Sequence, residues 1–384
     1  MHDTSRWACS MLAKLAAVCV LSTAWTVGVV AQNAYPIGVL IGLTGVQGAV
    51  AQRQIKAIEM ATEIINSKGG VHGRPLKLFV EDDQTKPDLS VPKALKLIDE
   101  DRVLAIVGGN SGDTAMAIGA IAERKEIPLL SPTGFNQTEA QRNYKYSFLM
   151  IPDYDDAIES LVKYSIDKAK CNKIGLLRLT RLWGVQASNA YKAMTAKYGA
   201  SIIREETLGD GDKDMTPQLT NIKAAEPCAV AIWAAVPAAA ISIKNARQIG
   251  IEVPLLGNPI FAAASTPEIA GAAAEGVIAT ATLVSTDPLP RQQEYVTKYH
   301  EKFGLAADMW DAAVYDAVHL VAKAISALPA DQVNPKAVRE QLAAIRRFEG
   351  AGAVVDFTKT RWPLSESWVM ITVKDGKAVR FPGP

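Results

Sequence analysis

The sequence predicts an α/β protein made of two lobes, each built on a doubly wound parallel sheet. Short runs rich in β-branched residues alternate with amphipathic segments, which is the pattern of repeated βαβ units. The alternation is interrupted at residues 152–155 and then starts again. A chain of 384 residues is also long enough for two domains of ordinary size, so we expect two α/β units.

The first 31 residues have the features of a secretory signal peptide. Arg6 and Lys14 give a basic start, residues 15–31 carry no charge, and the small-residue end at Ala31 is typical of a cleavage site. A membrane anchor is disfavoured because the apolar run is short and interrupted. A lipoprotein is disfavoured because Val18 precedes Cys19 where a small residue is needed. We therefore expect a periplasmic protein that begins at Gln32.

The mature chain would have 353 residues and a formal charge of zero, because cleavage removes two basic residues and one acid. Neither nucleic acid nor an anionic membrane is indicated as a partner. Only Cys171 and Cys228 remain after cleavage, too few for a zinc site, and no cofactor is expected. In an oxidising compartment they are able to form one disulfide, and two free thiols are the alternative.

Strands and helices are expected in a regular order. In the first half, strands are expected at 37–41, 76–81, 103–107 and 127–130, with a helix at 52–66. In the second half, strands are expected at 174–179, 201–207, 229–233 and 254–257, and helices at 188–198, 217–224 and 238–248. Asp155 is the expected N-cap of the helix after the break. A strand at 276–281, a long helix at 308–327 and short antiparallel strands near Val354, Val369 and Val379 complete the chain.

Four segments carry a resemblance to a known family. They are IGVLIGLTG from Ile37, INSKGGVHGRPLKLFVEDDQTKP from Ile65, IVGGNSGDTAMAIGAIAERKEIPLLSPTG from Ile106, and EIAGAAAEGVIAT from Glu268. In this order and spacing, the chain resembles the leucine/isoleucine/valine-binding protein family, the type I periplasmic binding proteins. The resemblance runs from Tyr35 to about Val379.

This resemblance implies more than the element order does. Three strands would cross between the lobes as a hinge, so that residues 35–151 and 285–353 form lobe one and residues 152–284 and 354–384 form lobe two. A small carboxylate or amino acid would bind between the lobes. The chain would be a monomer that serves a membrane permease of an ABC importer.

A glycine-rich loop after the third expected strand is the first candidate binding site. It contains Asn110, Ser111, Gly112, Asp113 and Thr114 and opens a helix. Free N–H groups at a helix start attract an anion, and members of the family bind the ligand carboxylate here. The alternative is an ordinary turn in which Ser111 or Asp113 caps the helix.

Other candidates lie on later loops. The resemblance implies ligand contacts at Thr133, Gly134 and Phe135, and Trp183 stands where the family has a tyrosine at the end of the first strand of lobe two. Trp310 and Asp311 open the long helix near another contact region of the family. Helix-face packing explains Trp310 equally well, and the alternative for Asp311 is a simple preference for the helix N-terminus.

The resemblance also implies which ligand is bound. Amino-acid-binding members hold the ligand ammonium with a carboxylate where this chain has Pro259, and Val50 and Phe135 replace two further polar residues. A buried ammonium without a counter-charge is costly. We therefore favour an aromatic or other small acid that lacks an α-amino group over a branched-chain-type amino acid. Glu268 or Asp311 remains an alternative source of the missing charge.

In the family's strand order, the strands that follow Cys171 and Cys228 are neighbours, which implies a disulfide between them.

A catalytic role is not indicated, because His72, His300 and His319 fall in no catalytic or metal-binding spacing and no dinucleotide fingerprint follows the first strand. A ligand-sensing receptor domain without transport is the main alternative, and a nucleotide-cofactor enzyme is a weaker one.

Overall fold

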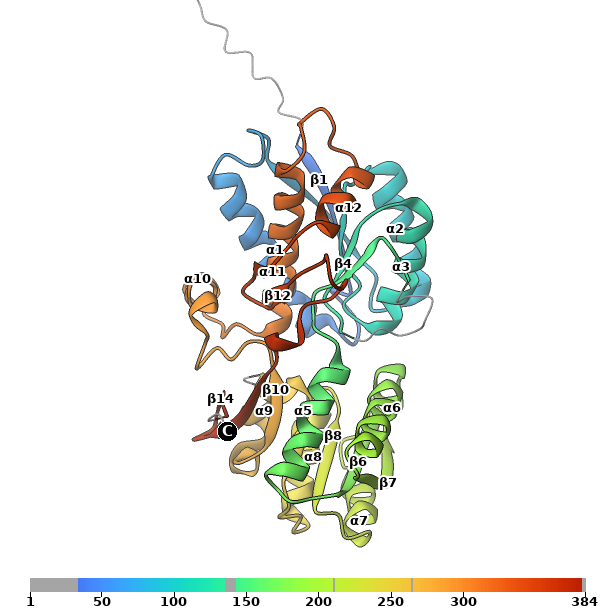
Figure 1. Cartoon of the computed structure of the whole chain (residues 1–384), viewed down its shortest axis with the longest axis vertical. Helices are drawn as coiled ribbons and strands as arrows, with labels where there is room; N and C mark the ends of the chain where they lie inside the picture. The colour runs from blue at the N-terminus through green and yellow to red at the C-terminus, as the bar shows by residue number, and fades with distance from the viewer. Residues whose placement is uncertain (1–33, 135–142, 210, 264, 382–384) are drawn as a thin grey trace, which may run out of the picture. The chain divides into compact units, whose positions relative to one another are not determined.

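The computed structural model describes residues 34–134, 143–209, 211–263 and 265–381. Two main sheets, one parallel and one mostly parallel, organise them (Figure 1), so the predicted fold class is confirmed. The first sheet has the order β2-β1-β3-β4-β5 and is parallel throughout. Its strands are β1 (Tyr35–Ile41), β2 (Leu76–Asp82), β3 (Ile106–Gly108), β4 (Leu129–Ser131) and β5 (Ser147–Leu149).

Helices from two distant parts of the chain pack with the first sheet. The N-terminal ones are α1 (Gly48–Ser67), α2 (Pro87–Leu95) with the π-helical turn η1 (Lys96–Glu100), and α3 (Gly112–Lys125). The C-terminal ones are α10 (Gln293–Phe303), α11 (Met309–Ser326) and α12 (Pro335–Ala343). Helix α11 is buried along most of its length because it packs against α1, β3 and β4.

The second sheet has the order β14-β13-β10-β9-β8-β6-β7. Its first five strands in sequence are parallel and are β6 (Lys173–Leu179), β7 (Ser201–Leu208), β8 (Ala229–Trp233), β9 (Leu255–Gly257) and β10 (Ile278–Ala281). The antiparallel hairpin of β13 (Val369–Lys374) and β14 (Lys377–Arg380) extends it along β10, as the short strands near the C-terminus predicted.

The helices of the second sheet lie between its strands in the sequence. They are α5 (Tyr154–Asp167), α6 (Leu182–Lys197), α7 (Thr216–Ala224), α8 (Ala238–Gln248) and α9 (Ser265–Ala270). Short 3-10 turns are η2 (Pro259–Ala262), η3 (Gly271–Ala274), η4 (Pro290–Gln292) and η5 (Ser365–Ser367), and β11 (Phe348–Glu349) pairs with β12 (Val354–Val355).

Two local expectations need correction. The N-cap of α5 is Asp153 and not Asp155, since the Asp153 carboxylate accepts the amide hydrogen of Asp155 at 3.2 Å. Strand β3 begins at Ile106, three residues later than expected, because the amide of Val103 is hydrogen-bonded to Leu97 in the preceding turn.

The segment that follows β12 lies beside the first sheet before the chain reaches the second sheet. Phe357 packs against Phe148 with ring centroids 4.8 Å apart, and the amide of Leu149 donates to the carbonyl of Arg361. These contacts keep the segment beside strand β5 of the first sheet. The chain enters the second sheet only at Val369.

A disulfide joins the starts of two neighbouring strands in the second sheet. Cys171 precedes β6 and Cys228 precedes β8, and these strands pair in parallel. The two Cα atoms are 5.4 Å apart, within the range that a disulfide needs.

Candidate functional site

Two of the predicted loops lie side by side because the strands that precede them are neighbours. Strands β3 and β4 pair in parallel, so the loops that follow them leave the same edge of the sheet. The Ser131 hydroxyl donates to the carbonyl of Gly109 at 2.9 Å and lies 3.1 Å from the Thr133 hydroxyl. The structure therefore brings the glycine-rich loop and Thr133 together.

The start of α3 is a reciprocal cap, as the structural alternative for this loop predicted. Ser111 is the N-cap, its hydroxyl accepts the amide hydrogen of Thr114, and the Thr114 hydroxyl accepts that of Ser111. A cap of this kind satisfies only part of the first turn. The amides of Gly112 and Asp113 stand at the positive end of the helix, where an anion is stabilised.

Asn110 has a structural role that its sequence position did not reveal. Its side chain is buried, its amide oxygen accepts from the amide of Gly42 at 3.1 Å, and its amide nitrogen donates to Gln54 at 3.2 Å. Asn110 therefore ties the end of β1 to helix α1. Both functional groups of the side chain are already engaged.

Gly134 is packed against the segment that leads into α5. A β-carbon at this position would lie 2.7 Å from the carbonyl oxygen of Pro152 and 3.0 Å from the ring of Tyr154. A larger residue would push this loop away from the connection between the sheets. Phe135, also predicted as a contact, lies outside the described residues.

Trp183 and Trp310 belong to one group of aromatic side chains, which we call the aromatic cluster. Its members are Tyr154, Trp183, Trp233, Trp310 and Trp368. Trp183 lies in the first turn of α6 rather than at the end of β6, and its ring is 5.7 Å from Trp233. Tyr154 is 5.7 Å from Trp233 and 5.6 Å from Trp368, and it is hydrogen-bonded to Trp310. Residues far apart in the chain thus form one partly buried aromatic wall.

Three members of the aromatic cluster were not predicted as site residues: Tyr154, Trp233 and Trp368. The signal for Tyr154 was present, because it lies in the break between the two repeated patterns, at residues 152–155. Burial raises the pKa of the Tyr154 hydroxyl, with the Trp310 hydrogen bond acting against that rise. Tyr154 therefore stays neutral and accepts a hydrogen bond from the Trp310 indole.

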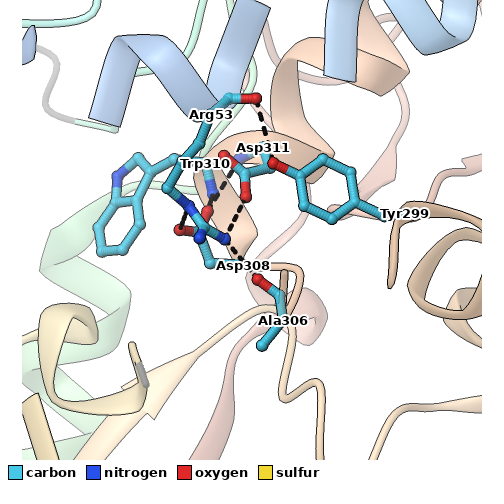
Figure 2. Close-up of polar contacts among 6 residues, drawn as sticks. All are labelled: Arg53, Tyr299, Ala306, Asp308, Trp310 and Asp311. Carbon is cyan, nitrogen blue, oxygen red and sulfur yellow. Dashed lines mark hydrogen bonds and ion pairs between the residues drawn. The ribbon is translucent and has the colours of Figure 1, made fainter. Parts of the chain in front are cut away.

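Arg53 holds the start of helix α11, next to Trp310 (Figure 2). Its guanidinium bonds Asp308 at 3.2 Å, Asp311 at 2.6 Å and the carbonyl of Ala306. The other oxygen of Asp308 caps the helix by accepting the amides of Trp310 and Asp311, both at 2.9 Å. One side chain of α1 thus fixes the first turn of α11.

Asp311 is the fully buried charge of this group, whereas the side chains of Arg53 and Asp308 are partly exposed. Burial opposes the charge of Arg53, but the carboxylates of Asp308 and Asp311 outweigh that effect and raise its pKa. Burial and the neighbouring Asp308 raise the pKa of Asp311, and Arg53 acts in the opposite direction. Asp311 is fully buried and lies 2.6 Å from the Arg53 guanidinium. Its charge therefore already has a partner within the protein.

No charged side chain stands at position 259, where amino-acid-binding members of the family would have the carboxylate that holds the ligand ammonium. Pro259 is buried and opens turn η2, and the adjacent Asn258 side chain donates to the carbonyl of Ala234 at 2.9 Å. Glu268, one alternative source of a counter-charge, is exposed on α9. Asp311, the other alternative, is the carboxylate that Arg53 neutralises.

Two doubly wound α/β units joined by several chain segments are the architecture of the bilobal binding proteins. The chain belongs to the periplasmic binding protein family, whose sequence profile, described as "Periplasmic binding protein", matches residues 34–378.

Individual relatives have low sequence identity to this chain, but the matches cover more than half of it. The leucine-, isoleucine-, valine-, threonine-, and alanine-binding protein of Pseudomonas aeruginosa is 26% identical over 308 residues, 79% of this chain and 82% of that protein. An amino acid binding protein of the same organism is 25% identical over 215 residues, and the match spans 56% of this chain and 58% of that protein.

A solved structure shares the fold. The branched-chain amino acid transporter substrate binding protein LivJ of Streptococcus pneumoniae, in complex with isoleucine, is 21% identical with a TM-score of 0.79, covering 90% of this chain and 99% of that one. At this identity the likeness establishes the architecture.

Within the described ranges, no helix is both long and apolar enough to span a membrane. Across those same ranges, no group of three or more His, Cys, Asp or Glu side chains is placed to hold a metal ion.

Proposed function

We propose that this chain is the exported substrate-binding component of an ABC importer and that it binds a small carboxylate between its two sheets without catalysing a reaction. Membership of the periplasmic binding protein family over residues 34–378 is the observation that carries the proposal. The two adjacent loops at the carboxyl ends of β3 and β4 supply the kind of edge at which open α/β sheets bind ligands.

The carboxylate is proposed to bind at the start of α3. The amides of Gly112 and Asp113 favour an anion there, and the hydroxyls of Ser111, Thr114 and Thr133 are proposed to support it. The body of the ligand would contact Trp183 and Trp310 of the aromatic cluster, with Phe135 and Pro259 contributing apolar surface.

The ligand is proposed to lack an α-ammonium group, with an aromatic or other small acid favoured over a leucine-like amino acid. Pro259 replaces the expected acid, Glu268 is exposed and Asp311 is paired with Arg53. An ammonium buried against these residues would lose its hydration without gaining a counter-charge. The amino acids named for the relatives are the competing ligand class.

Matched ligand pairs test the class directly. Ligand-stripped protein would be titrated in a calorimeter with 3-phenylpropanoate against phenylalanine, and with 4-methylpentanoate against leucine. Each pair differs only in the α-ammonium group. We expect the acids to bind at least about tenfold more tightly, which corresponds to about 1.4 kcal/mol. Tight leucine binding with none by the acids would contradict the proposal.

Export, oligomeric state and transport need their own measurements. We propose cleavage after Ala31, so the intact mass of secreted protein should correspond to a chain that starts at Gln32. The mature protein should run as a monomer in light scattering. Deleting the gene should abolish uptake of the bound acid, and uptake should return with the wild-type gene.

A further inference from the structure

The group around Arg53 connects helix α1 to the helix that carries Trp310. Arg53 and its partners Asp308 and Asp311 are 255 and 258 residues apart in the chain. Figure 2 shows the guanidinium lying against the first turn of α11, with Trp310 on the same turn. The hydroxyl of Tyr299 donates to the backbone carbonyl of Arg53 at 3.2 Å and brings α10 into the same group.

Asp311 gives this group its importance. A fully buried carboxylate without a cation would cost several kcal/mol, so the first turn of α11 is stable in this place only while Arg53 is present. Asp308 cannot take the place of Arg53 as the partner of Asp311, because it is itself a carboxylate. It also already caps the helix. Any change in Arg53 should therefore be transmitted to the backbone of Trp310.

We propose that Arg53 is a positioning residue for the ligand site: it fixes the first turn of α11 and thereby holds the Trp310 indole against Tyr154. This inference rests on the proposed function for its consequence, because Trp310 is taken to contact the ligand. In this proposal Arg53 acts through the first turn of α11 and not by contacting the ligand. By neutralising Asp311, it also leaves that carboxylate without free charge to offer a ligand ammonium.

The experiment follows Trp310 directly. Mature protein would be labelled with 5-fluorotryptophan, and the fluorine resonance of Trp310 assigned by its loss in Trp310→Phe. The resonance and the dissociation constant for 3-phenylpropanoate would then be measured in Arg53→Met, Arg53→Lys and the double variant Arg53→Met/Asp311→Asn. Thermal unfolding of each variant would be recorded in parallel.

Arg347→Met is the matched control. Arg347 also pairs with two carboxylates, Glu349 at 3.0 Å and Glu366 at 2.8 Å, but all three side chains are exposed. Its loss should leave the Trp310 resonance and the dissociation constant unchanged.

We expect Arg53→Met to shift or broaden the Trp310 resonance and to weaken 3-phenylpropanoate binding by about tenfold or more. Arg53→Lys should restore both only in part, because one ammonium cannot bridge three acceptors as a guanidinium does. The double variant should recover most of both readouts, since it removes the unpaired carboxylate, and it keeps the test informative if Arg53→Met fails to fold.

Lower thermal stability with an unchanged Trp310 resonance and unchanged affinity would overturn the proposal, because that is the behaviour of a purely structural ion pair. A different outcome is that Arg53→Met shifts the Trp310 resonance as expected, while the wild-type protein binds none of the acids or amino acids. It would count against the proposed ligand class and leave the positioning role of Arg53 supported.

Discussion

Asp316 should make the stability of the protein depend on pH in a way that one substitution removes. It lies on α11, fully buried, and its carboxylate accepts the amides of Ala351 at 2.8 Å and Gly352 at 2.7 Å. Burial raises the pKa of Asp316 from 3.8 to about 7, against the opposing effect of these amides and of Arg291. Tyr295 of α10 also faces it.

The direction of this pH dependence of stability follows from proton linkage. Between pH 3.8 and about 7 the folded protein holds the Asp316 proton more tightly than the unfolded chain does. The stabilisation is therefore complete below the unfolded pKa, and it is lost as the pH rises through the folded pKa. From pH 5 to pH 8 the loss amounts to about 3 kcal/mol, since each pKa unit corresponds to about 1.4 kcal/mol.

Asp316→Asn should abolish this part of the pH dependence. Asparagine retains one acceptor oxygen for the 351–353 loop, but it does not titrate. Urea unfolding followed by circular dichroism, with the disulfide oxidised, would give the free energy of unfolding of both proteins at pH 5 and pH 8. The wild-type value minus the variant value should be larger at pH 5 by about 3 kcal/mol. The same difference at both pH values would refute the reasoning.

Two further predictions concern covalent and steric constraints. Unfolded, unreduced protein should show no free thiol on titration, and replacing both Cys171 and Cys228 by serine should lower the free energy of unfolding by about 2–4 kcal/mol; finding two free thiols would contradict the disulfide. Gly108→Ala should cost about 3 kcal/mol or more in urea unfolding, because its β-carbon would lie 1.9 Å from the carbonyl oxygen of Leu40. A variant of wild-type stability would show that β1 and β3 are less closely packed.

The sequence was a good guide to the sheets because their strands are buried on both faces. Strands such as β1 and β8 are almost entirely apolar, and parallel strands of this kind are visible as β-branched runs without any knowledge of their partners. The cap of α5 was misplaced by two residues because Asp153 and Asp155 both suit the position. Only the backbone geometry distinguishes them.

Asp311 was a candidate from the sequence, but its pairing with Arg53 was not predictable from sequence pattern. Arg53 lies in an amphipathic helix, where an arginine is normally a solvated surface residue. Its partners are more than 250 residues away, and no local spacing connects them. The aromatic cluster was found only in part for the same reason, since Trp183 and Trp310 meet through Tyr154 and Trp233.

Asn110 offers a last test of where the ligand site ends and its support begins. Both groups of its side-chain amide are engaged, with Gly42 at 3.1 Å and Gln54 at 3.2 Å. Asn110→Ala should therefore lower the free energy of unfolding by about 1–3 kcal/mol, because it leaves buried polar groups without partners. Ser111→Ala should cost about 1 kcal/mol through the lost cap. At a temperature where both variants are folded, Ser111→Ala should weaken 3-phenylpropanoate binding more than Asn110→Ala does. The reverse order would make Asn110 a ligand contact and place the carboxylate nearer to β1 than to the start of α3.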